Sequence, residues 1–496
     1  MSSTRVIIHD PFKAWKFLVI PTIRVISTCA FYLFCTIASI SFIFYFAFTS
    51  QTQGCPHCRR MIVNQKFTNS NITTEYENTN ISHIVFGIAG STKTWNKRKN
   101  YTELWWKPNI TRGFVWLDEK PPDNFTWPKT SPPYKVSGDI SRFKYTCWYG
   151  SRSAVRLARI VKESFELGLN NVRWFVMGDD DTVFFTENLL TVLSKYDHNQ
   201  MYYIGGNSES VEQDVVFSYK MAYGGGGFAI SYPLAAKLVR ILDGCIDRYA
   251  NLYGSDQKIQ ACLSEIGVPL TKELGFHQVD IKGNPYGLLA AHPLAPLVTL
   301  HHLDSIQTLF PNLTQLDSFK KLISAYNVDP SRTLQQSFCY DLKRNWSVSV
   351  SWGYIVQLYP SLITAKELET AFLTFQTFRT SSEKPFTFNT RPVSTDQCKK
   401  PVLYYLDRVQ RVGVSQSLTT YKRHVEDSEI GCGRVDYASA LIVPSFNVSA
   451  SSFNPDLWNQ APRRQCCEVV DGSDGVESGI QVNIRSCNQF ESVTPP

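Results

Sequence analysis

Three consecutive aspartates, Asp179, Asp180 and Asp181, follow one apolar run of the sequence and precede another. Carboxylates this close together repel one another, which is costly unless a cation is held between them. Carboxylate oxygens select Mg²⁺ or Mn²⁺, and such a metal can neutralise the charge that develops on a departing diphosphate. The Asp-X-Asp spacing therefore favours a metal site with Asp179 and Asp181 as ligands. A solvated acidic turn that caps a helix over residues 186–196 is the alternative.

A run of four glycines, from Gly224 to Gly227, precedes a strand-like segment over residues 228–232. Glycine has no side chain, so the backbone of such a run can approach a bound ligand closely. We expect Gly225, Gly226 and Gly227 to lie against that ligand. The run is not a phosphate loop, because the Lys and Ser/Thr of that pattern are absent. A flexible connector is the alternative.

Two further positions carry groups that could take part in chemistry. Asp256 lies in the first turn of a helix whose apolar residues recur at helical spacing over residues 259–266. An acid there suits a general base if it faces the site, and otherwise only complements the helix dipole. His301 and His302 end a strand-like run, and strand alternation would point them to opposite faces. We therefore expect at most one of them to bind a metal.

The elements that must position these residues alternate between strands and helices. Residues 83–90, 113–118 and 174–177 are apolar runs suited to buried parallel strands, and residues 151–167 have the spacing of an amphipathic helix. This alternation predicts an α/β fold with a mostly parallel sheet. Ligands of such sheets bind outside the carboxyl ends of the strands, which is where the aspartates fall.

The N-terminal region predicts a membrane anchor. Residues 25–48 contain no charged side chain, and about 20 apolar residues suffice to cross a bilayer. The preceding tail, residues 1–24, carries four basic residues and one acid, Asp10, which keeps the N-terminus cytoplasmic. A cleaved signal peptide is the alternative, although its apolar region is usually about 7–15 residues long.

Glycosylation motifs and cysteines agree with a lumenal location for the rest of the chain. Asn-X-Ser/Thr acceptors occur only after the anchor, at Asn71, Asn80, Asn100, Asn109, Asn124, Asn312, Asn345 and Asn447. Of the 13 cysteines, all but Cys29 and Cys35 also lie beyond it, where an oxidising compartment would pair them. Their odd number leaves one thiol free or intermolecular, so a homodimer through the stem or the odd cysteine is an expectation. The Cys55 and Cys58 pair favours a stem disulfide or dimer bridge over zinc, because no second pair follows at finger spacing.

Composition limits the remaining functions. Residues 49–80 are predicted to form a polar stem, since residues 64–80 are rich in Asn and Thr and have no hydrophobic period. The formal net charge of +7 is modest for 496 residues, and no dense basic run occurs beyond residue 60. Nucleic acid is therefore excluded as an expected partner.

The order of these motifs resembles a known family. The chain is similar to the fringe-like branch of inverting β1,3-glycosyltransferases, glycosyltransferase family 31, and most of all to the fringe-related proteins of plants. The core 1 β1,3-galactosyltransferases are more distant. The resemblance covers roughly residues 81–310 and rests on the segments HIVFGIAGS, RGFVWLDE, GDDDTVFFTENL, YGGGGFAIS, YGSDQKIQACLSEIGV and VTLHHLDS.

The resemblance implies roles for individual residues. Asp179 and Asp181 match the ends of the family's Asp-X-Asp, with Asp181 as the direct ligand of Mn²⁺ or Mg²⁺ and Asp180 beside the donor. His301 matches a metal-binding histidine, followed by the acid Asp304. Asp256 matches the catalytic base. The glycine run matches a stretch beside the donor sugar, where Gly226 stands in place of a common alanine.

The resemblance also implies an activity and a cellular location. It implies a GT-A catalytic domain over residues 81–320 and a single-pass type II protein of the Golgi membrane. The reaction would move a hexose or N-acetylhexosamine from a UDP-sugar to a glycan or glycoprotein acceptor, with inversion and a β1,3 linkage.

Residues 321–496 lie outside the resemblance. Their six cysteines and β-like pieces predict a disulfide-bonded, strand-rich accessory domain that helps to hold the acceptor or shields the catalytic core. Two other functions remain as alternatives, a lectin-like protein without turnover and a metal-dependent phosphohydrolase. The second generally needs another cluster of acids or histidines for a second metal, and none is clear.

Overall fold

The computed structural model describes residues 41, 78–378, 390–425, 432–471 and 479–493. The chain divides into two compact units, Met1–Glu75 and Tyr76–Pro496. Apart from residue 41, the expected anchor over residues 25–48 lies outside the described residues, as does the stem up to residue 77. Among the residues that are described, no helix has the length and apolar character to cross a membrane.

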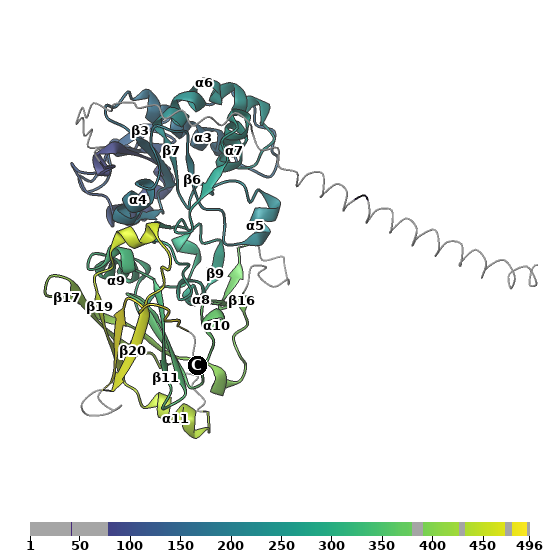
Figure 1. Cartoon of the computed structure of the whole chain (residues 1–496). Helices are drawn as coiled ribbons and strands as arrows, with labels where there is room; N and C mark the ends of the chain where they lie inside the picture. The colour runs from purple at the N-terminus through teal and green to yellow at the C-terminus, as the bar shows by residue number, and fades with distance from the viewer. Residues whose placement is uncertain (1–40, 42–77, 379–389, 426–431, 472–478, 494–496) are drawn as a thin grey trace, which may run out of the picture. The chain divides into compact units, whose positions relative to one another are not determined.

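A seven-stranded mixed sheet forms the first half of this unit, in the order β3-β2-β1-β4-β7-β6-β8 (Figure 1). Its strands are β1 (Ile84–Ala89), β2 (Gly113–Leu117), β3 (Tyr134–Val136), β4 (Trp174–Asp179), β6 (Tyr203–Gly205), β7 (Phe228–Ser231) and β8 (Leu270–Lys272). All neighbouring strands run parallel except that β7 is antiparallel to both β4 and β6. The parallel-rich α/β sheet expected from the sequence is therefore confirmed.

Helices cover both faces of the sheet. On one face lie α3 (Ser153–Glu166), α6 (Tyr232–Arg248) and α7 (Ser255–Ile266), and on the other lie α2 (Thr92–Glu103) and α4 (Thr186–Leu193). The other α-helices of the described residues are α5 (Val211–Val216), α8 (Tyr286–Leu289), α9 (Gln315–Tyr326), α10 (Ala365–Leu368) and α11 (Val435–Leu441). Side chains alternate across a strand, so Val85 packs with α3, α6 and α7 while Phe86 faces the other core. That second core also contains residues of α2, α4, α9 and the C-terminal strands.

Eight strands of the C-terminal half form a closed barrel, which confirms the expected strand-rich region. They are β11 (Gln336–Asp341), β12 (Trp346–Ser351), β13 (Ile355–Tyr359), β17 (Val402–Val412), β18 (Gln416–Arg423), β19 (Ser445–Ser451), β20 (Cys466–Asp471) and β21 (Ile480–Arg485). Closure removes exposed strand edges. The boundary expected after residue 320 falls inside α9, and the first barrel strand begins at Gln336.

Disulfides fasten both halves. The six C-terminal cysteines form the pairs Cys339–Cys467, Cys398–Cys432 and Cys466–Cys487, and Cys245–Cys262 joins α6 to α7. Cys147 is a buried free thiol. Since a buried thiol cannot reach a second chain, Cys147 does not offer the intermolecular bridge considered from the cysteine count.

Three short two-stranded sheets complete the fold. They pair β5 (Val183–Phe184) with β10 (Thr299–Leu300), β14 (Ala371–Phe372) with β16 (Thr390–Arg391), and β9 (Ile281–Gly283) with β15 (Phe375–Thr377). The first brings the histidine segment to the aspartates, and the last ties the C-terminal half to the segment that follows β8.

Candidate functional site

The register between β5 and β10 places His301 beside the aspartate turn. Leu300, the last residue of β10, pairs with Val183, so the residue that follows β10 falls beside the residues that precede β5. The Nε2 atom of His301 lies 3.2 Å from Asp181 Oδ1 and 3.6 Å from Asp179 Oδ2. One ligand atom from each of these three side chains lies within 4.8 Å of the others. We call Asp179, Asp181 and His301 the triad.

Hydrogen bonds fix the shape of the aspartate turn. The Asp179 amide donates to Thr182 Oγ1 at 2.8 Å, and the same hydroxyl donates to the Gly225 carbonyl at 2.7 Å. The Thr182 amide donates back to the Asp179 carbonyl at 3.1 Å. The turn after β4 is thereby joined to the glycine run that precedes β7.

Asp180 points away from the triad toward α2. Its carboxylate accepts hydrogen bonds from Thr94 Oγ1 at 2.9 Å and from the Arg98 guanidinium at 3.1 Å, and Thr102 donates to its carbonyl. With these partners and only 3% of its surface exposed, Asp180 holds the turn against α2. The Asp180 side chain is therefore not part of the triad.

Arg98 links three carboxylates. Besides Asp180, its guanidinium lies 3.3 Å from Asp181 Oδ2 and 3.2 Å from Asp304 Oδ2. Asp304 also accepts a hydrogen bond from Tyr101. Asp304, the acid that follows the histidines, is therefore held at the outer side of Arg98 and is not part of the triad.

The charges of the triad are strongly coupled. Loss of surrounding water raises the pKa of Asp179 to about 7, with Asp181 and Asp180 adding to the rise against the opposing effect of His301. This happens although 37% of the Asp179 side-chain surface stays exposed. Burial alone would raise the pKa of Asp181 as well, but His301 and Arg98 together lower it below its ordinary value. The same carboxylates raise the pKa of His301 to about 9 against the effect of its burial.

The triad has the donor set of a divalent-cation site. Two carboxylates and one imidazole converge. Oδ1 of Asp181 is buried and, among the described residues, has the ion pair with His301 but accepts no hydrogen bond. Oxygen ligands with one nitrogen suit Mn²⁺ and tolerate Mg²⁺. Asp179, Asp181 and His301 are the residues that could hold such an ion.

Two positions of the run require glycine, one because of a close approach and one because of its backbone conformation. A Cβ atom on Gly225 would lie 2.1 Å from His301 Cε1, so any side chain there would collide with the imidazole. Gly227 has a φ of 82°, which other residues rarely adopt. A Cβ atom on Gly226 would lie 3.1 Å from the Gln278 amide nitrogen, which is tight but calls for only a small shift. The departure from alanine at Gly226 therefore changes the local space little.

The glycine run connects the triad to Asp256. The Gly224 amide donates to Asp256 Oδ2 at 3.2 Å. Its neighbour Gly225 lies against the ring of His301, so adjacent residues of the run contact Asp256 and the triad. Asp256 lies in the first turn of α7, and Cys245–Cys262 fastens that helix to α6. Burial raises the pKa of Asp256, and the Gly224 hydrogen bond opposes this rise. The same carboxyl also raises the pKa of Asp179, so the two are electrostatically linked.

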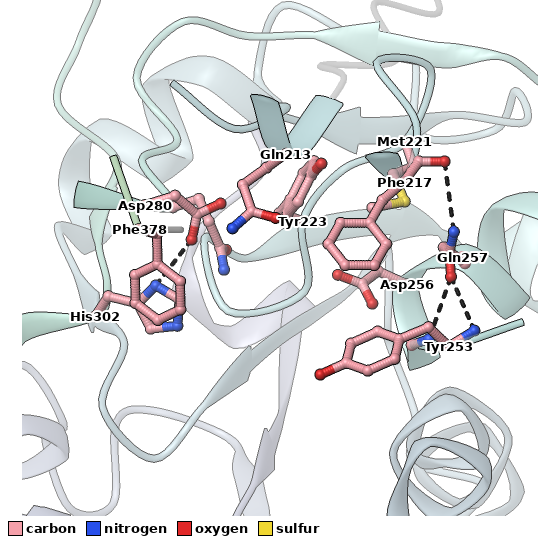
Figure 2. A pocket seen from close by; sticks show the side chains of 12 residues that line it. Gln213, Phe217, Met221, Tyr223, Tyr253, Asp256, Gln257, Asp280, His302 and Phe378 are labelled. Atoms are coloured by element: carbon pink, nitrogen blue, oxygen red, sulfur yellow. Dashed lines mark hydrogen bonds and ion pairs between the residues drawn. The ribbon is translucent and has the colours of Figure 1, made fainter. Parts of the chain in front are cut away.

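Asp256 lines a pocket of about 390 Å³, shown in Figure 2. The pocket is lined by Gln213, Phe217, Met221, Tyr223, Tyr253, Gly254, Asp256, Gln257, Gln278, Asp280, His302 and Phe378. In Figure 2, Phe217 and Tyr253 flank Asp256, whereas Asp280, His302 and Phe378 form the opposite wall. Aromatic walls with a few placed polar groups are typical of small-molecule sites.

His302 belongs to the wall of this pocket and not to the triad. Its backbone is left-handed, with a φ of 54°, so strand alternation no longer governs its direction. Its Nδ1 lies 2.9 Å from Asp280 Oδ1, and its ring stacks on Phe378 with centroids 4.7 Å apart. Only His301 faces the aspartates, which agrees with the expectation that at most one of the two histidines does so. The cause is the left-handed backbone of His302 and not the alternation of side chains along a strand.

Several residues of the site were not found from the sequence. Thr94, Arg98 and Tyr101 recur at helical spacing, which is a signal that they share one face of α2. Arg98 is flanked by Lys97 and Lys99, so its charge alone did not distinguish it. Phe378 gave no signal, because it lies beyond the segment in which the other site residues occur.

The fold and the site define a mixed α/β protein with a carboxylate and histidine cluster at the carboxyl end of β4. A model of a family described as proteins of unknown function, DUF604, matches residues 213–467, which is more than half of the 496 residues. The chain belongs to this family. The matched segment includes the glycine run, Asp256, His301 and most of the barrel.

The chain is also similar to a protein whose description names an activity. A protein of Mus musculus described as Beta-1,3-glucosyltransferase is 30% identical to this chain over 139 residues. The similar segment covers 28% of this chain, and the chain spans only 27% of the length of that relative. This relative is a β1,3-glycosyltransferase, the class that the sequence motifs resemble, and the similarity is limited to this segment.

Proposed function

We propose that this chain is a divalent-metal-dependent glycosyltransferase with a GT-A catalytic domain, which transfers a sugar from a UDP-sugar to a glycan or glycoprotein with inversion. The observation that carries the proposal is the convergence of Asp179, Asp181 and His301 within 4.8 Å, joined by the glycine run to Asp256. The similarity to a β1,3-glucosyltransferase supports a hexose donor and a β1,3 linkage.

The triad would hold the metal. Mn²⁺ bound there would supply positive charge to offset the negative charge that grows on the departing UDP. Arg98 forms ion pairs with Asp181 and with the neighbouring Asp180, so the ligand Asp181 is positioned before any ion arrives. Gly225 leaves room for the His301 ring.

Asp256 would act as the general base. Its carboxylate would accept the proton of the acceptor hydroxyl as the hydroxyl oxygen forms its bond to the anomeric carbon. The bond from that carbon to the UDP oxygen breaks on the opposite face, which inverts the configuration. The Gly224 amide orients the carboxylate, and Phe217 and Tyr253 flank it in the pocket.

A Golgi location as a type II membrane protein is part of the proposal and rests on the sequence of residues 1–50. Exposed acceptor asparagines agree with a lumenal side, since Asn100, Asn109, Asn124 and Asn312 are all exposed. Protease added to intact microsomes is expected to spare the chain and to digest it once detergent is present. Digestion without detergent would contradict this orientation.

The test of the activity is UDP release from a panel of UDP-sugars, with and without Mn²⁺ and with mixed glycan acceptors. Wild-type protein is expected to release UDP from one donor only with the metal, and Asp181→Asn is expected to release none. Asp317→Asn, an exposed aspartate on α9, is the matched control. Sugar binding without any UDP release would favour a lectin-like protein, and phosphate release without sugar transfer would favour a phosphohydrolase.

A further inference from the structure

Four aromatic side chains lead away from Asp256 across the surface. The ring centroids of Phe217 and Tyr253 lie 5.2 Å apart, those of Tyr253 and Tyr149 lie 5.5 Å apart, and Tyr149 is followed by Trp148 at 5.3 Å. The first two pairs are stacked, with interplanar angles of 28° and 12°. We call Phe217, Tyr253, Tyr149 and Trp148 the aromatic run.

The aromatic run becomes more exposed with distance from Asp256. The exposed fraction is 39% for Tyr253, 57% for Tyr149 and 91% for Trp148. Contiguous exposed apolar side chains commonly mark a binding surface, whereas single ones need no explanation. A row of rings that begins in the pocket and ends in solvent is therefore placed to contact a molecule that enters the pocket.

The inner part of the aromatic run is held in place. Gln257 accepts a hydrogen bond from the Tyr253 amide at 3.0 Å and donates to the Phe217 carbonyl at 3.4 Å (Figure 2). Tyr145 donates to the Tyr253 carbonyl at 2.9 Å. These bonds hold the backbone of Phe217 and Tyr253, and binding surfaces built on fixed segments lose little conformational freedom when a ligand arrives.

A second observation, at Gln213, indicates that the pocket suits a polar ligand. Gln213 lines it with only 6% of its surface exposed, and Oε1 of this side chain accepts no hydrogen bond within the described residues. A buried amide oxygen without a donor is costly. A ligand that carries hydroxyl groups as well as an apolar face would satisfy both Gln213 and the rings.

The direction of the aromatic run identifies which substrate it meets. If the triad binds the departing diphosphate, as proposed above, the acceptor must approach the anomeric carbon from the opposite side, where Asp256 lies. Phe217 and Tyr253 flank Asp256 on the pocket wall across from His302. Pyranose rings have an apolar face of C–H groups, which packs on aromatic faces while the hydroxyls stay hydrated.

We infer that the acceptor is an oligosaccharide of at least two hexopyranose rings. The terminal ring lies at Asp256 with Gln213 as a hydrogen-bond donor or acceptor to its hydroxyls, and the following rings pack on Tyr253, Tyr149 and Trp148. This inference deepens the proposed transferase function and rests on it for the direction of approach. The length of the aromatic run makes a monosaccharide an incomplete acceptor.

The experiment compares p-nitrophenyl mono-, di- and trisaccharides of β-linked glucose, galactose and N-acetylglucosamine. With the donor found by UDP release, wild-type kcat/KM is expected to rise from mono- to trisaccharide. Trp148→Ala is expected to lower kcat/KM for the trisaccharide by about 3–10-fold, the range of one aromatic contact, and to leave the monosaccharide unchanged. Phe490→Ala, which removes another highly exposed aromatic ring, is the control.

Two kinetic outcomes overturn the inference. One is a wild-type enzyme with no preference for longer acceptors, and the other is a Trp148→Ala variant that loses the same factor on every acceptor. Binding of the same trisaccharides without a donor, measured by saturation-transfer NMR, separates this inference from the transferase proposal. Binding that depends on Trp148 in a protein with no turnover would support the surface and reject the enzyme, and absence of both would reject the surface.

Discussion

Gly225 and His301 are so close that only a glycine fits beside the imidazole. A Cβ atom built on Gly225 would lie 2.1 Å from Cε1 and 2.4 Å from Nε2 of His301, well inside any allowed contact. The glycine run therefore shapes the triad and, through the Gly224 amide, also holds the carboxylate of Asp256. This relationship gives the first prediction.

Gly225→Ala is expected to displace the His301 ring and to weaken Mn²⁺ binding by about 10–100-fold, the loss typical of residues that orient a ligand. Gly226→Ala is the matched control, because its Cβ would need only a small shift of Gln278. Calorimetric titration with Mn²⁺ measures both. Equal Mn²⁺ affinity in the two variants would show that the histidine does not serve the metal.

The two neighbouring aspartates are expected to differ in metal binding. Asp181→Asn should abolish measurable Mn²⁺ binding because it removes a converging ligand, and it should also lower Tm because it removes one of the carboxylate partners of Arg98. Asp180→Asn should keep most of the Mn²⁺ affinity but lose about 1–3 kcal/mol of unfolding free energy, since another carboxylate partner of Arg98 is removed. Titration with Mn²⁺ and thermal unfolding of both variants provide the readouts, and a reversed pattern would contradict the assignment of the triad.

Asp256→Asn tests the base. The variant should lower the rate of sugar transfer by about 10²–10⁴-fold while its affinity for UDP and Mn²⁺ stays close to wild type. Asp280→Asn is the comparison, because Asp280 lines the same pocket but is already engaged by Ser208 and His302. Single-turnover transfer measures both. A wild-type rate for Asp256→Asn would move the base to Asp280, since Asp304 is held by Arg98 and Tyr101 outside the pocket.

A pH effect on stability is expected from Asp214. Burial raises its pKa from 3.8 to about 6, against an opposing hydrogen bond from Asn207. Between these values the folded protein holds a proton that the unfolded chain has lost, so the unfolding free energy falls as pH rises through this window. Asp214→Asn should therefore raise Tm more at about pH 7.5 than at about pH 4.5. An equal change in Tm at both pH values would show that Asp214 does not titrate in this way.

Local patterns were sufficient to predict the elements of the sheet. The apolar runs at 83–90, 113–118 and 174–177 correspond to β1, β2 and β4, and the periodic segment 151–167 corresponds to α3. These elements bury their side chains in the manner their periodicity indicates. The antiparallel direction of β7 and the closure of the barrel could not be predicted, because both depend on pairings between segments distant in sequence.

The candidate site could be predicted only where a motif carried its own signal. The aspartates, the glycine run, Asp256 and His301 stood out by type and spacing, and the structure brings them together through the pairing of β5 with β10. Arg98 and Gln278 were not found, since a single cation among lysines and a single amide have no pattern of their own. Their roles arise from tertiary contacts.

Phe378 lies far beyond the segment that resembles known transferases, yet it forms part of the wall of the pocket that holds Asp256. β15 delivers it by pairing with β9, and the Phe378 amide donates to the Asp280 carbonyl at 3.2 Å. The two halves of the chain are therefore not interchangeable modules. A chimera that joins this sheet to another barrel would therefore replace part of one wall of the pocket that holds Asp256.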